Sequence, residues 1–344
     1  MKVLIAGLGS VGQRHARNLR ASCGAGVEIL AYRVRGLPQV ITDTMTIDDT
    51  VTVEAACGIR SFASLDEALA ERPDAVMICN PNSLHLQTAM AAAHAGCHLF
   101  IEKPLSHTGD GVDDLIAVVE RQRLVATVGY QLRCHPALAR ARALLCQGAI
   151  GPLRSVRAEF GEYLPLAHPY EDYRQSYAAR ADLGGGVILC YIHEFDYLTW
   201  WFGLPQRVTT TGGRLGQLEI DVEDTAITVM DYRFADRDVI VELHLSFLTR
   251  PAARTCRIEG DHGVIEVDLN APSLTMTTAA GAVERQTFDG FKRNQLFVDE
   301  LSHFMTAMAG GHAPMVPLRE AARSLRVALA ARESLALGQA VTLS

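Results

Sequence analysis

The sequence lacks the cysteine patterns that mark disulfide-rich proteins and zinc proteins. It has no C-x-x-C pair, and several of its cysteines lie in apolar runs such as VMICN. The eight cysteines are scattered at positions 23, 57, 79, 97, 134, 146, 190 and 256. Such spacing is typical of buried thiols in a reducing compartment, and it argues against disulfides and metal sites. We therefore expect no bound metal.

Long apolar runs and an excess of basic charge are also missing. No uninterrupted apolar stretch approaches the roughly 18 residues that a membrane span needs, and the start MKVLIAGLGS lacks a signal-peptide core. Lysines and arginines number 32 against 39 aspartates and glutamates, a net charge of −7, and they form no basic stripe. We expect a cytoplasmic protein that binds neither membrane nor nucleic acid.

Length and composition predict two globular domains. The chain has 344 residues, 49% of them apolar, and a mean hydropathy of +0.10. A domain usually takes roughly 100–200 residues, so one core is too few for this length. The rhythm of the sequence changes after residue 126, so we expect one domain at residues 1–126 and a second at residues 127–344, whose last helix could pack back on the first.

The segment KVLIAGLGSVGQRHARNLR, residues 2–20, predicts a strand, a tight turn and a helix. Gly7, Gly9 and Gly12 form a G-x-G-x-x-G fingerprint directly after the strand, which is the context that a dinucleotide site requires. Such glycines let a pyrophosphate approach the free N–H groups and positive dipole of the helix N-terminus. The alternative is a glycine-rich turn with no ligand.

The second expected strand, VEILAYR, ends in Tyr32 and Arg33 where an acid usually binds the ribose 2′-OH of NAD. An arginine suits a 2′-phosphate, so Arg33 favours NADP over NAD. Alternatively, Arg33 is a solvated loop charge and the ribose is held in another way.

Strand and helix patterns alternate up to residue 131. SLDEALAERP, SLHLQTAMAAAHAG and TGDGVDDLIAVVERQR predict helices, and DAVMICN, CHLFIEK and LVATVGYQ predict buried strands. This rhythm predicts a doubly wound parallel sheet, in which ligands lie beyond the carboxyl ends of the strands. Glu102 and Lys103, at one such end, should face the cofactor crevice. A surface ion pair worth at most about 1 kcal/mol is the alternative.

The second half predicts a large, mostly antiparallel sheet with one open face. Its alternating stretches are PLRSVRAEFGEYL, QRVTTTGGRL, DTAITVMDYRF, DVIVELHLSFL, RTCRIEGDHGVIEVDL, SLTMTTAAG and AVERQTF. Two amphipathic helices, NQLFVDELSHFMTAM and PLREAARSLRVALAARESL, close the chain. A second copy would be the simplest cover for the open face, so we expect a homodimer or homotetramer built on this sheet.

The segment ADLGGGVILCYIHEFDYLTWWFG carries a candidate acid/base. His193 and Asp196 share one helix face, so Asp196 could orient the imidazole or simply cap its own turn. A lone histidine on an apolar helix is often a core group, so this segment alone does not assign catalysis.

Together these motifs resemble the glucose–fructose oxidoreductase, inositol dehydrogenase and rhizopine-catabolism (Gfo/Idh/MocA) family of NAD(P)-dependent oxidoreductases. The resemblance spans nearly the whole chain. It is carried by the glycine fingerprint followed by RHA, and by CNPNSLH, IEKPLS, GYQLRCHP, the GGG…HEFD segment and IEGDHGVIEVD. IEKPLS contains the most specific of these motifs, the E-K-P tripeptide.

The resemblance implies a Rossmann domain, an open-faced α/β domain, and hydride transfer between nicotinamide and a secondary alcohol or ketone of a sugar, nucleotide sugar or cyclitol. Lys103 would polarise the oxygen and His193 would be the acid/base, a pairing that the chemistry supports. Many members carry an aspartate four residues before that histidine, where this chain has Leu189, so a full catalytic trio is not transferred. The cofactor-binding residues that the resemblance implies are Gly7, Gly9, Ser10, Val11, Gly12, Asn80, Pro81, Asn82, His85, Glu102 and Lys103. Arg33, from the end of the second strand, completes the expected set.

The segment EYLPLAHPYEDYRQSYAARADLGGG is a candidate substrate wall, because it is rich in groups that suit polyol hydroxyls, a carboxylate or a phosphate. The candidate substrate residues are Tyr163, His168, Tyr170, Asp172, Tyr173, Arg174 and His193, with Arg133, His135, Arg293 and Asn294 as further residues that could face the cleft. An exposed loop of ordinary polar content is the alternative for each.

Two other functions stay open at this point. One is a non-catalytic regulatory protein of the same fold that binds the dinucleotide without turnover. The other is a dehydrogenase of small oxo acids or of a tetrapyrrole on a related fold.

Overall fold

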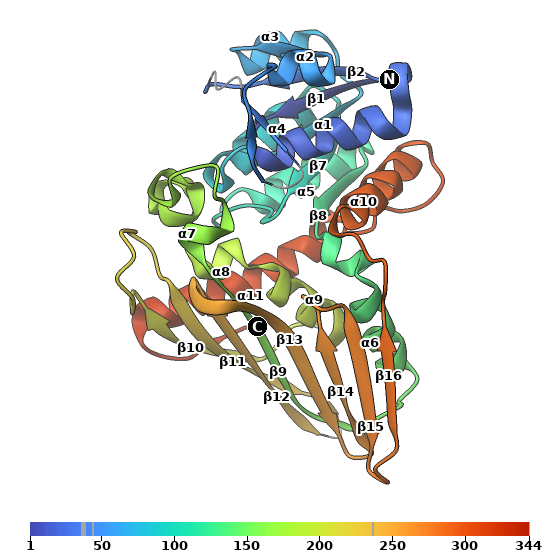
Figure 1. Ribbon diagram of the computed structural model, residues 1–344, viewed down its shortest axis with the longest axis vertical. Coiled ribbons are helices and arrows are strands. Elements are labelled where there is room, and N and C mark those ends of the chain that lie inside the picture. The colour runs from blue at the N-terminus through green and yellow to red at the C-terminus, as the bar shows by residue number, and fades with distance from the viewer. Residues whose placement is uncertain (36–38, 43–44, 236, 344) are drawn as a thin grey trace.

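The computed structural model describes residues 1–35, 39–42, 45–235 and 237–343. Two sheets dominate it: a parallel sheet in the N-terminal part, and a larger sheet that fills the opposite end of the molecule (Figure 1). Helices from both halves of the chain lie between them (Figure 1).

The N-terminal sheet has six strands in the order β5-β2-β1-β6-β7-β8, and each neighbouring pair is parallel. This order confirms the expected doubly wound sheet. The chain adds β2 and β5 on one side of β1 and then β6, β7 and β8 on the other, so the switch point of the topology lies between β1 and β6. The strands are β1 (Lys2–Ala6), β2 (Glu28–Tyr32), β5 (Ile59–Phe62), β6 (Ala75–Ile78), β7 (His98–Glu102) and β8 (Ala126–Gly129). The last strand runs to Gly129, beyond the domain limit expected at residue 126.

Helices and short segments connect these strands. Local capping fixes two of the helix starts: the Ser64 hydroxyl accepts a hydrogen bond from the Glu67 N–H, and Thr52 accepts one from Ala55. The elements are α1 (Ser10–Cys23), η1 (Gly24–Gly26), the β3 (Val40–Ile41) and β4 (Ile47–Asp48) pair, α2 (Val53–Cys57), α3 (Leu65–Ala70), η2 (Asn82–Leu84), α4 (His85–His94) and α5 (Val112–Gln122).

The second sheet has nine strands in the order β16-β15-β14-β13-β9-β12-β11-β10-β17. Strands β9 and β12 pair in parallel, and the other described neighbours are antiparallel, as expected for a mostly antiparallel sheet. The strands are β9 (Leu153–Tyr163), β10 (Arg207–Gly213), β11 (Thr225–Arg233), β12 (Asp238–Ser246), β13 (Leu248–Gly260), β14 (Gly263–Asp268), β15 (Ser273–Thr278), β16 (Val283–Thr287) and β17 (Val341–Thr342).

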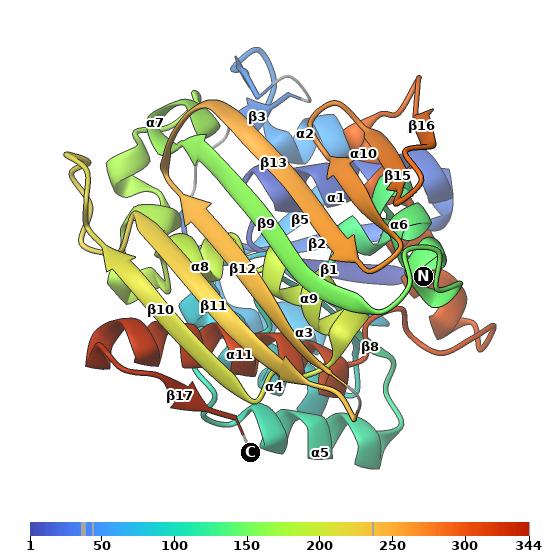
Figure 2. The same cartoon turned by 90° about the horizontal axis from the view of Figure 1, so that it is seen from below.

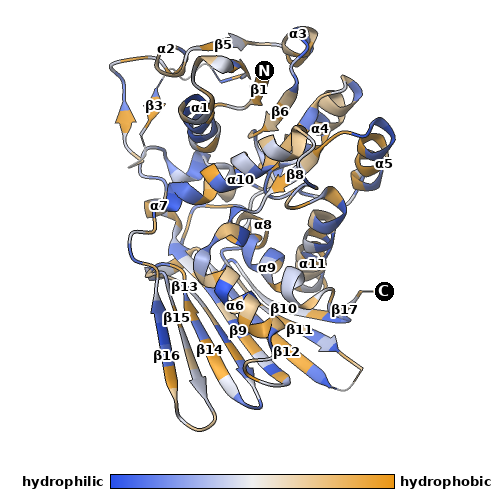
Figure 3. Cartoon of the chain, turned by 90° about the vertical axis from the view of Figure 1, so that its right-hand side faces the viewer, coloured by the Kyte–Doolittle hydropathy of each residue, from blue (hydrophilic) through white to orange (hydrophobic). Residues whose placement is uncertain are grey.

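Helices cover one face of this sheet and leave the other open (Figure 2). Residues of the two faces alternate along a strand: on β12, Val239 and Val241 are buried, while Ile240 between them is 55% exposed. Figure 3 shows polar and apolar residues in turn along the strands of this sheet. The remaining elements are η3 (Gln131–Cys134), α6 (Pro136–Cys146), α7 (Leu164–Ala167), η4 (Tyr173–Gln175), η5 (Tyr177–Ala179), η6 (Ala181–Leu183), α8 (Val187–Cys190), α9 (His193–Phe202), α10 (Arg293–Met308) and α11 (Leu318–Leu337).

The last two helices return to the N-terminal domain. The side chains of Leu301 and Phe304 on α10 are buried in the same apolar cluster as Ile5 and Phe100 of the parallel sheet. Just before α11, the Val316 carbonyl accepts a hydrogen bond from the Val128 N–H on β8. Within the described residues, every helix is too short or too polar to cross a bilayer.

Candidate active site

The glycine turn after β1 is shaped for close approach. Gly7 has φ +103, and a Cβ placed there would lie 2.8 Å from the Asn80 nitrogen. A Cβ on Gly12 would collide with the carbonyl oxygen of Gly7. Gly9 is the N-cap of α1 and has open space around it, and no side chain caps the helix. The free N–H groups of the first turn, including those of Ser10 and Val11, therefore suit a pyrophosphate.

A hollow of about 280 Å³ lies beside this turn, at the carboxyl ends of β2 and β6. Its position next to the glycine turn suits the adenosine half of a dinucleotide. Asp66 on α3 contributes a carboxylate to it, a residue that the sequence reasoning did not single out. The lining residues are Tyr32, Leu65, Asp66, Asn80, Leu84, Gln87, Thr88 and Ala91.

Arg33 follows β2 and already has an acidic partner. Its Nη1 lies 2.7 Å from Glu54 Oε1, and its Nε donates to the Arg35 carbonyl at 3.2 Å. A bound 2′-phosphate would therefore compete with Glu54 for the guanidinium. The role of Arg33 in cofactor choice stays a prediction.

The loops after β6 and β7 are tied together by His85. Its Nδ1 lies 2.7 Å from the Pro104 carbonyl oxygen and its Nε2 lies 2.9 Å from the Asn80 carbonyl oxygen. Both ring nitrogens thus contact backbone, which makes this buried ring a link between the two loops. In the same region, beyond Pro81, Asn82 Nδ2 donates to the Gly184 carbonyl at 2.9 Å, a bond that joins the two domains.

Lys103 and His193 are held close to each other from different domains. The Lys103 ammonium donates to the Cys190 carbonyl at 2.9 Å, just before the turn that leads to His193, the first residue of α9. Burial lowers the pKa of Lys103 from its ordinary value. Burial, followed by the charges of Lys103, Arg254 and Arg293, holds the pKa of His193 well below its ordinary value.

The lowered pKa keeps the ring of His193 neutral near neutral pH. Its Nδ1 is buried and has no hydrogen-bond partner among the described residues. The ring packs edge-on against Tyr130, with centroids 5.8 Å apart. A neutral imidazole beside an ammonium has the composition that proton transfer from a hydroxyl requires.

Asp196 does not orient His193. The Asp196 carboxylate is buried and takes two hydrogen bonds from Arg133, at 2.8 and 2.7 Å, and a third from Ser324 at 2.9 Å. A buried carboxylate requires a cation, and Arg133 provides it from η3. Arg133 also contacts Glu320 at 2.7 Å, so its guanidinium is engaged in this network. The contact of Arg133 with substrate stays a prediction.

Three more residues considered for the cleft are placed as follows. His135 is the N-cap of α6, and burial lowers its pKa to about 4. Arg293 begins α10 and lies close enough to lower the pKa of His193. Asn294 donates to Asn18 Oδ1 on α1 at 2.9 Å, which joins the two helices.

The expected substrate segment divides into two parts. His168 and Tyr170 lie near the site: the charge of Lys103 contributes to lowering the pKa of His168 to about 4, and Ser10 of the glycine turn is close enough to affect the pKa of Tyr170. Burial is the main cause of both pKa shifts and raises the pKa of Tyr170 to about 12. Tyr163, at the end of β9, lies under the guanidinium of Arg250 at 3.2 Å.

The other part of the segment turns toward an exposed loop. Arg174 Nη2 donates to Asp172 Oδ2 at 2.8 Å, and its Nη1 donates to Glu219 Oε2 at 3.1 Å. The Tyr173 hydroxyl accepts a hydrogen bond from the Glu219 N–H at 3.2 Å. Asp172, Tyr173 and Arg174 are thus engaged in contacts with one another and with Glu219. Their contact with substrate stays a prediction.

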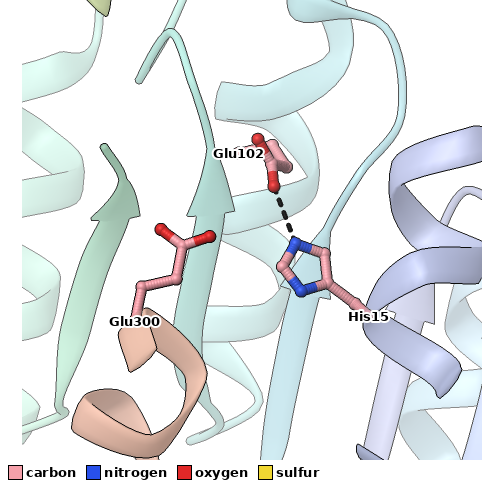
Figure 4. A group of neighbouring side chains, drawn as sticks. All are labelled: His15, Glu102 and Glu300. Carbon is pink, nitrogen blue, oxygen red and sulfur yellow. Dashed lines mark hydrogen bonds and ion pairs between the residues drawn. The ribbon is translucent and has the colours of Figure 1, made fainter. Parts of the chain in front are cut away.

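Glu102 belongs to a buried group, with His15 and Glu300, that the sequence reasoning missed (Figure 4). Glu102 Oε1 is 2.7 Å from His15 Nε2, and Glu300 comes from α10 on the other side. A nitrogen or oxygen atom of each of the three lies within 4.8 Å of one from each of the others. A signal existed, because Glu300 falls on the apolar stripe of its helix, between Leu296, Phe297, Leu301 and Phe304.

Two domain models of one family match the chain. The model for an oxidoreductase family with an NAD-binding Rossmann fold, Gfo/Idh/MocA, matches residues 1–130, and a Gfo/Idh/MocA C-terminal domain matches residues 138–266. The glycine turn, its uncapped helix and the adjoining hollow fit the dinucleotide that this fold binds.

Relatives that are named as dehydrogenases match this chain along most of their length. D-xylose 1-dehydrogenase (NADP(+)) 2 of Haloferax volcanii is 28% identical over 86% of this chain and 87% of its own. The scyllo-inositol 2-dehydrogenase (NAD(+)) of Bacillus subtilis is 26% identical over 100% of this chain and 96% of its own. Among solved structures, the UDP-N-acetylglucosamine 3-dehydrogenase from Acidithiobacillus ferrooxidans is 25% identical, with a TM-score of 0.75 over 97% of each chain. The chain is an NAD(P)-dependent oxidoreductase of CH–OH groups and belongs to the Gfo/Idh/MocA family.

Proposed function

We propose that the protein oxidises or reduces a secondary alcohol or ketone of a sugar, nucleotide sugar or cyclitol, with Lys103 and His193 as its catalytic residues. One observation carries the proposal. His193 is neutral and buried, and it lies near the Lys103 ammonium, which follows the carboxyl end of β7 in the parallel sheet. The two carboxylates that follow His193 on α9, Glu194 and Asp196, are each paired with an arginine.

His193 handles the proton of the substrate hydroxyl, and Lys103 stabilises the charge on the substrate oxygen. The nicotinamide, when bound, supplies the acceptor or donor of the hydride. His193 takes the proton of the substrate hydroxyl onto its ring in the oxidation direction and returns it in reduction. The Lys103 ammonium stabilises negative charge on the same oxygen, and its fixed bond to the Cys190 carbonyl orients it.

The cofactor would lie across the carboxyl ends of β1, β6 and β7. The glycine turn, with Gly7, Gly9 and Gly12, holds the pyrophosphate, and the hollow beside Tyr32 receives the adenosine. The remaining cofactor residues are Ser10, Val11, Arg33, Asn80, Pro81, Asn82, His85, Glu102 and Lys103, with Glu102 and Lys103 nearest the nicotinamide. Arg33 supports NADP, although Asp66 in the hollow offers an acid of the kind that binds an NAD ribose.

A nucleotide sugar is the substrate class that we favour. His168 and Tyr170 would cover the catalytic pair, while the exposed Asp172 and Arg174, with Tyr173 between them, would meet the longer part of such a substrate. The structural likeness to a UDP-N-acetylglucosamine 3-dehydrogenase supports this choice.

The test is nicotinamide absorbance with purified protein, NADP and NAD in parallel, against sugars, cyclitols and nucleotide sugars. We expect turnover of at least one compound by the wild type and its loss in Lys103→Ala. Lys292→Ala is the matched control, because Lys292 is exposed and precedes α10. Equal turnover by wild type and Lys103→Ala would contradict the catalytic assignment.

We also propose that two copies pair through the open face of the nine-stranded sheet. This face carries exposed Ile240 and Ile227 among ion pairs such as Arg157 with Glu242, at 3.1 Å. Light scattering should give a dimer or tetramer for the wild type and a smaller species for Ile240→Glu. A monomeric wild type would contradict this assembly.

A further inference from the structure

Several buried polar atoms in the group formed by His15, Glu102 and Glu300 lack a hydrogen-bond partner among the described residues. His15 is 0% exposed and Glu300 is 2% exposed. Beyond the bond from His15 Nε2 to Glu102 Oε1, neither oxygen of Glu300 has a partner among the described residues, and the same is true of His15 Nδ1. Buried carboxyl oxygens without donors are costly when charged.

The surroundings of this group are apolar. His15 packs edge-on against Phe100, with centroids 5.0 Å apart, and against Phe297 at 6.0 Å. Phe304 of α10 packs on the other side of Phe100 at 5.6 Å. In this setting burial, and next the neighbouring charge of Glu102, raises the pKa of Glu300 well above its ordinary value.

The geometry favours a shared proton over a metal ion. Two donors that bind one tetrahedral ion at ordinary bond lengths stand about 3.3 Å apart. The 2.7 Å between His15 Nε2 and Glu102 Oε1 is the length of a charge-assisted hydrogen bond. We therefore treat the group as one that holds protons, with metal binding as an outcome that the experiment can detect.

We propose that Glu300 is a positioning residue that acts on the nicotinamide through Glu102, and that its buried carboxyl exchanges a proton with solvent when the bound ring changes charge. The inference rests on the proposed placement of the nicotinamide beside Glu102. The oxidised ring is positive, so it stabilises the ionised carboxyl pair, and Glu300 releases its proton to solvent. The reduced ring is neutral, and Glu300 keeps its proton.

Other ionisable groups face this pair from each neighbouring element. They add no third carboxyl at the centre of the group. The groups are Cys79 after β6, Cys134 in η3, Lys103 after β7, His85 on α4 and Tyr177 in η5, with Asp299 and His303 on α10 itself.

The expected signature is a pH-dependent preference for the oxidised dinucleotide. Because its binding releases a proton, its Kd should fall as the pH rises, by up to about tenfold per pH unit for one linked proton. The Kd of the reduced dinucleotide should stay flat. Protonation of a 2′-phosphate would change both constants alike, so the ratio of the two Kd values isolates the effect of the ring charge.

The experiment measures both constants on the full chain without substrate, from about pH 6 to about pH 9. Fluorescence of the reduced nicotinamide gives one Kd, and competition by the oxidised form gives the other. We expect a sloping ratio in the wild type and a flat ratio in Glu300→Gln, which has the same shape but no exchangeable acid proton. Glu300→Asp should restore a slope, and Asp299→Asn, which changes an exposed acid on the same helix, should leave it unchanged.

A direct measurement does not depend on the folding of the variants. Titration of weakly buffered wild type with oxidised dinucleotide and an indicator dye should release close to one proton per site. A flat ratio or zero release, a slope that persists in Glu300→Gln, or a stoichiometric bound metal would each overturn the inference. Substrate turnover with a flat ratio would leave the proposed function standing, whereas a wild type that binds neither dinucleotide would overturn both.

Discussion

Two sets of buried ionisable groups differ in how completely they are paired. The carboxylates that follow His193 are fully matched: Glu194 contacts Arg254 at 2.7 and 3.0 Å, and Asp196 contacts Arg133 at 2.8 and 2.7 Å. On the side of the parallel sheet, His193 and Glu300 each keep unpartnered polar atoms among the residues described.

In the proposed mechanism, this difference separates structural charges from reactive groups. A bidentate arginine fixes a carboxylate and removes its tendency to exchange protons. A buried imidazole or carboxyl with an open position keeps that tendency, at a cost to stability. Pairing therefore tells more about function here than charge itself, since both sets are equally buried.

The largest expected effect is on the incompletely paired set. His193→Asn keeps a polar side chain of similar size but removes the base, and we expect kcat to fall by about 10²–10⁴-fold with dinucleotide binding retained. Steady-state rates and dinucleotide titrations measure the two quantities. Thr199→Ser on the same helix is the control, and unchanged kcat in His193→Asn would place His193 with the structural charges.

The paired set should fail through folding instead. Arg133→Met leaves Asp196 buried without its cation, which costs about 3–5 kcal/mol in the free energy of unfolding. Denaturant titration of the variant measures it. Arg154→Met breaks the exposed pair with Asp261 and should cost no more than about 1 kcal/mol. Equal losses in the free energy of unfolding of the two variants would contradict the distinction between buried and exposed pairs.

Acid should destabilise the molecule through buried neutral histidines. The pKa of His135 is about 4 in the folded protein, below the ordinary 6.5, so the unfolded chain binds a proton that the folded chain does not. Its contribution is full above pH 6.5 and is lost as the pH falls toward about 4, by about 1.4 kcal/mol per pH unit.

Denaturant titrations across this range measure the slope. His135→Asn, which keeps a capping side chain, should make it shallower, whereas substitution of the exposed His312 by Gln should not. A slope unchanged by His135→Asn would mean that other groups carry the acid sensitivity.

The smallest effect concerns Arg33, a paired charge with an expected binding role. Arg33→Ser should weaken NADP by about tenfold, the loss of about 1.4 kcal/mol, and leave NAD nearly unchanged. Glu54→Gln should strengthen NADP, since it removes the competing acid. Dinucleotide titrations test both, with Arg60→Ser as the exposed control. Equal changes for the two cofactors would assign Arg33 to structure alone.

Local patterns in the sequence were enough to predict the first domain. The glycine fingerprint, the alternating helices and the carboxyl-end position of Glu102 and Lys103 all depend on neighbours within a few residues. The doubly wound parallel sheet and the mostly antiparallel second sheet are confirmed. The parallel pairing of β9 with β12 could not be read from the sequence, because it joins strands that other elements separate along the chain.

The site was harder to predict where partners are distant in sequence. His193 and Asp196 share a helix face, but the hydrogen-bond partner of Asp196 is Arg133 from η3, not His193. Glu300 meets His15 only because α10 packs on α1. The apolar stripe around Glu300 was visible in the sequence, yet its partner was not, since periodicity gives the buried face of a helix without naming what it contacts.

The return of α10 to the first domain has a consequence for synthesis of the chain. Leu301 and Phe304 complete a core that also contains Ile5 and Phe100, so this face of the parallel sheet stays uncovered until the ribosome has made residues beyond 308. A nascent or truncated fragment that ends near residue 130 lacks α10 and therefore exposes Phe100. The dinucleotide half is therefore a domain by topology, but it depends on the far end of the polypeptide to mature.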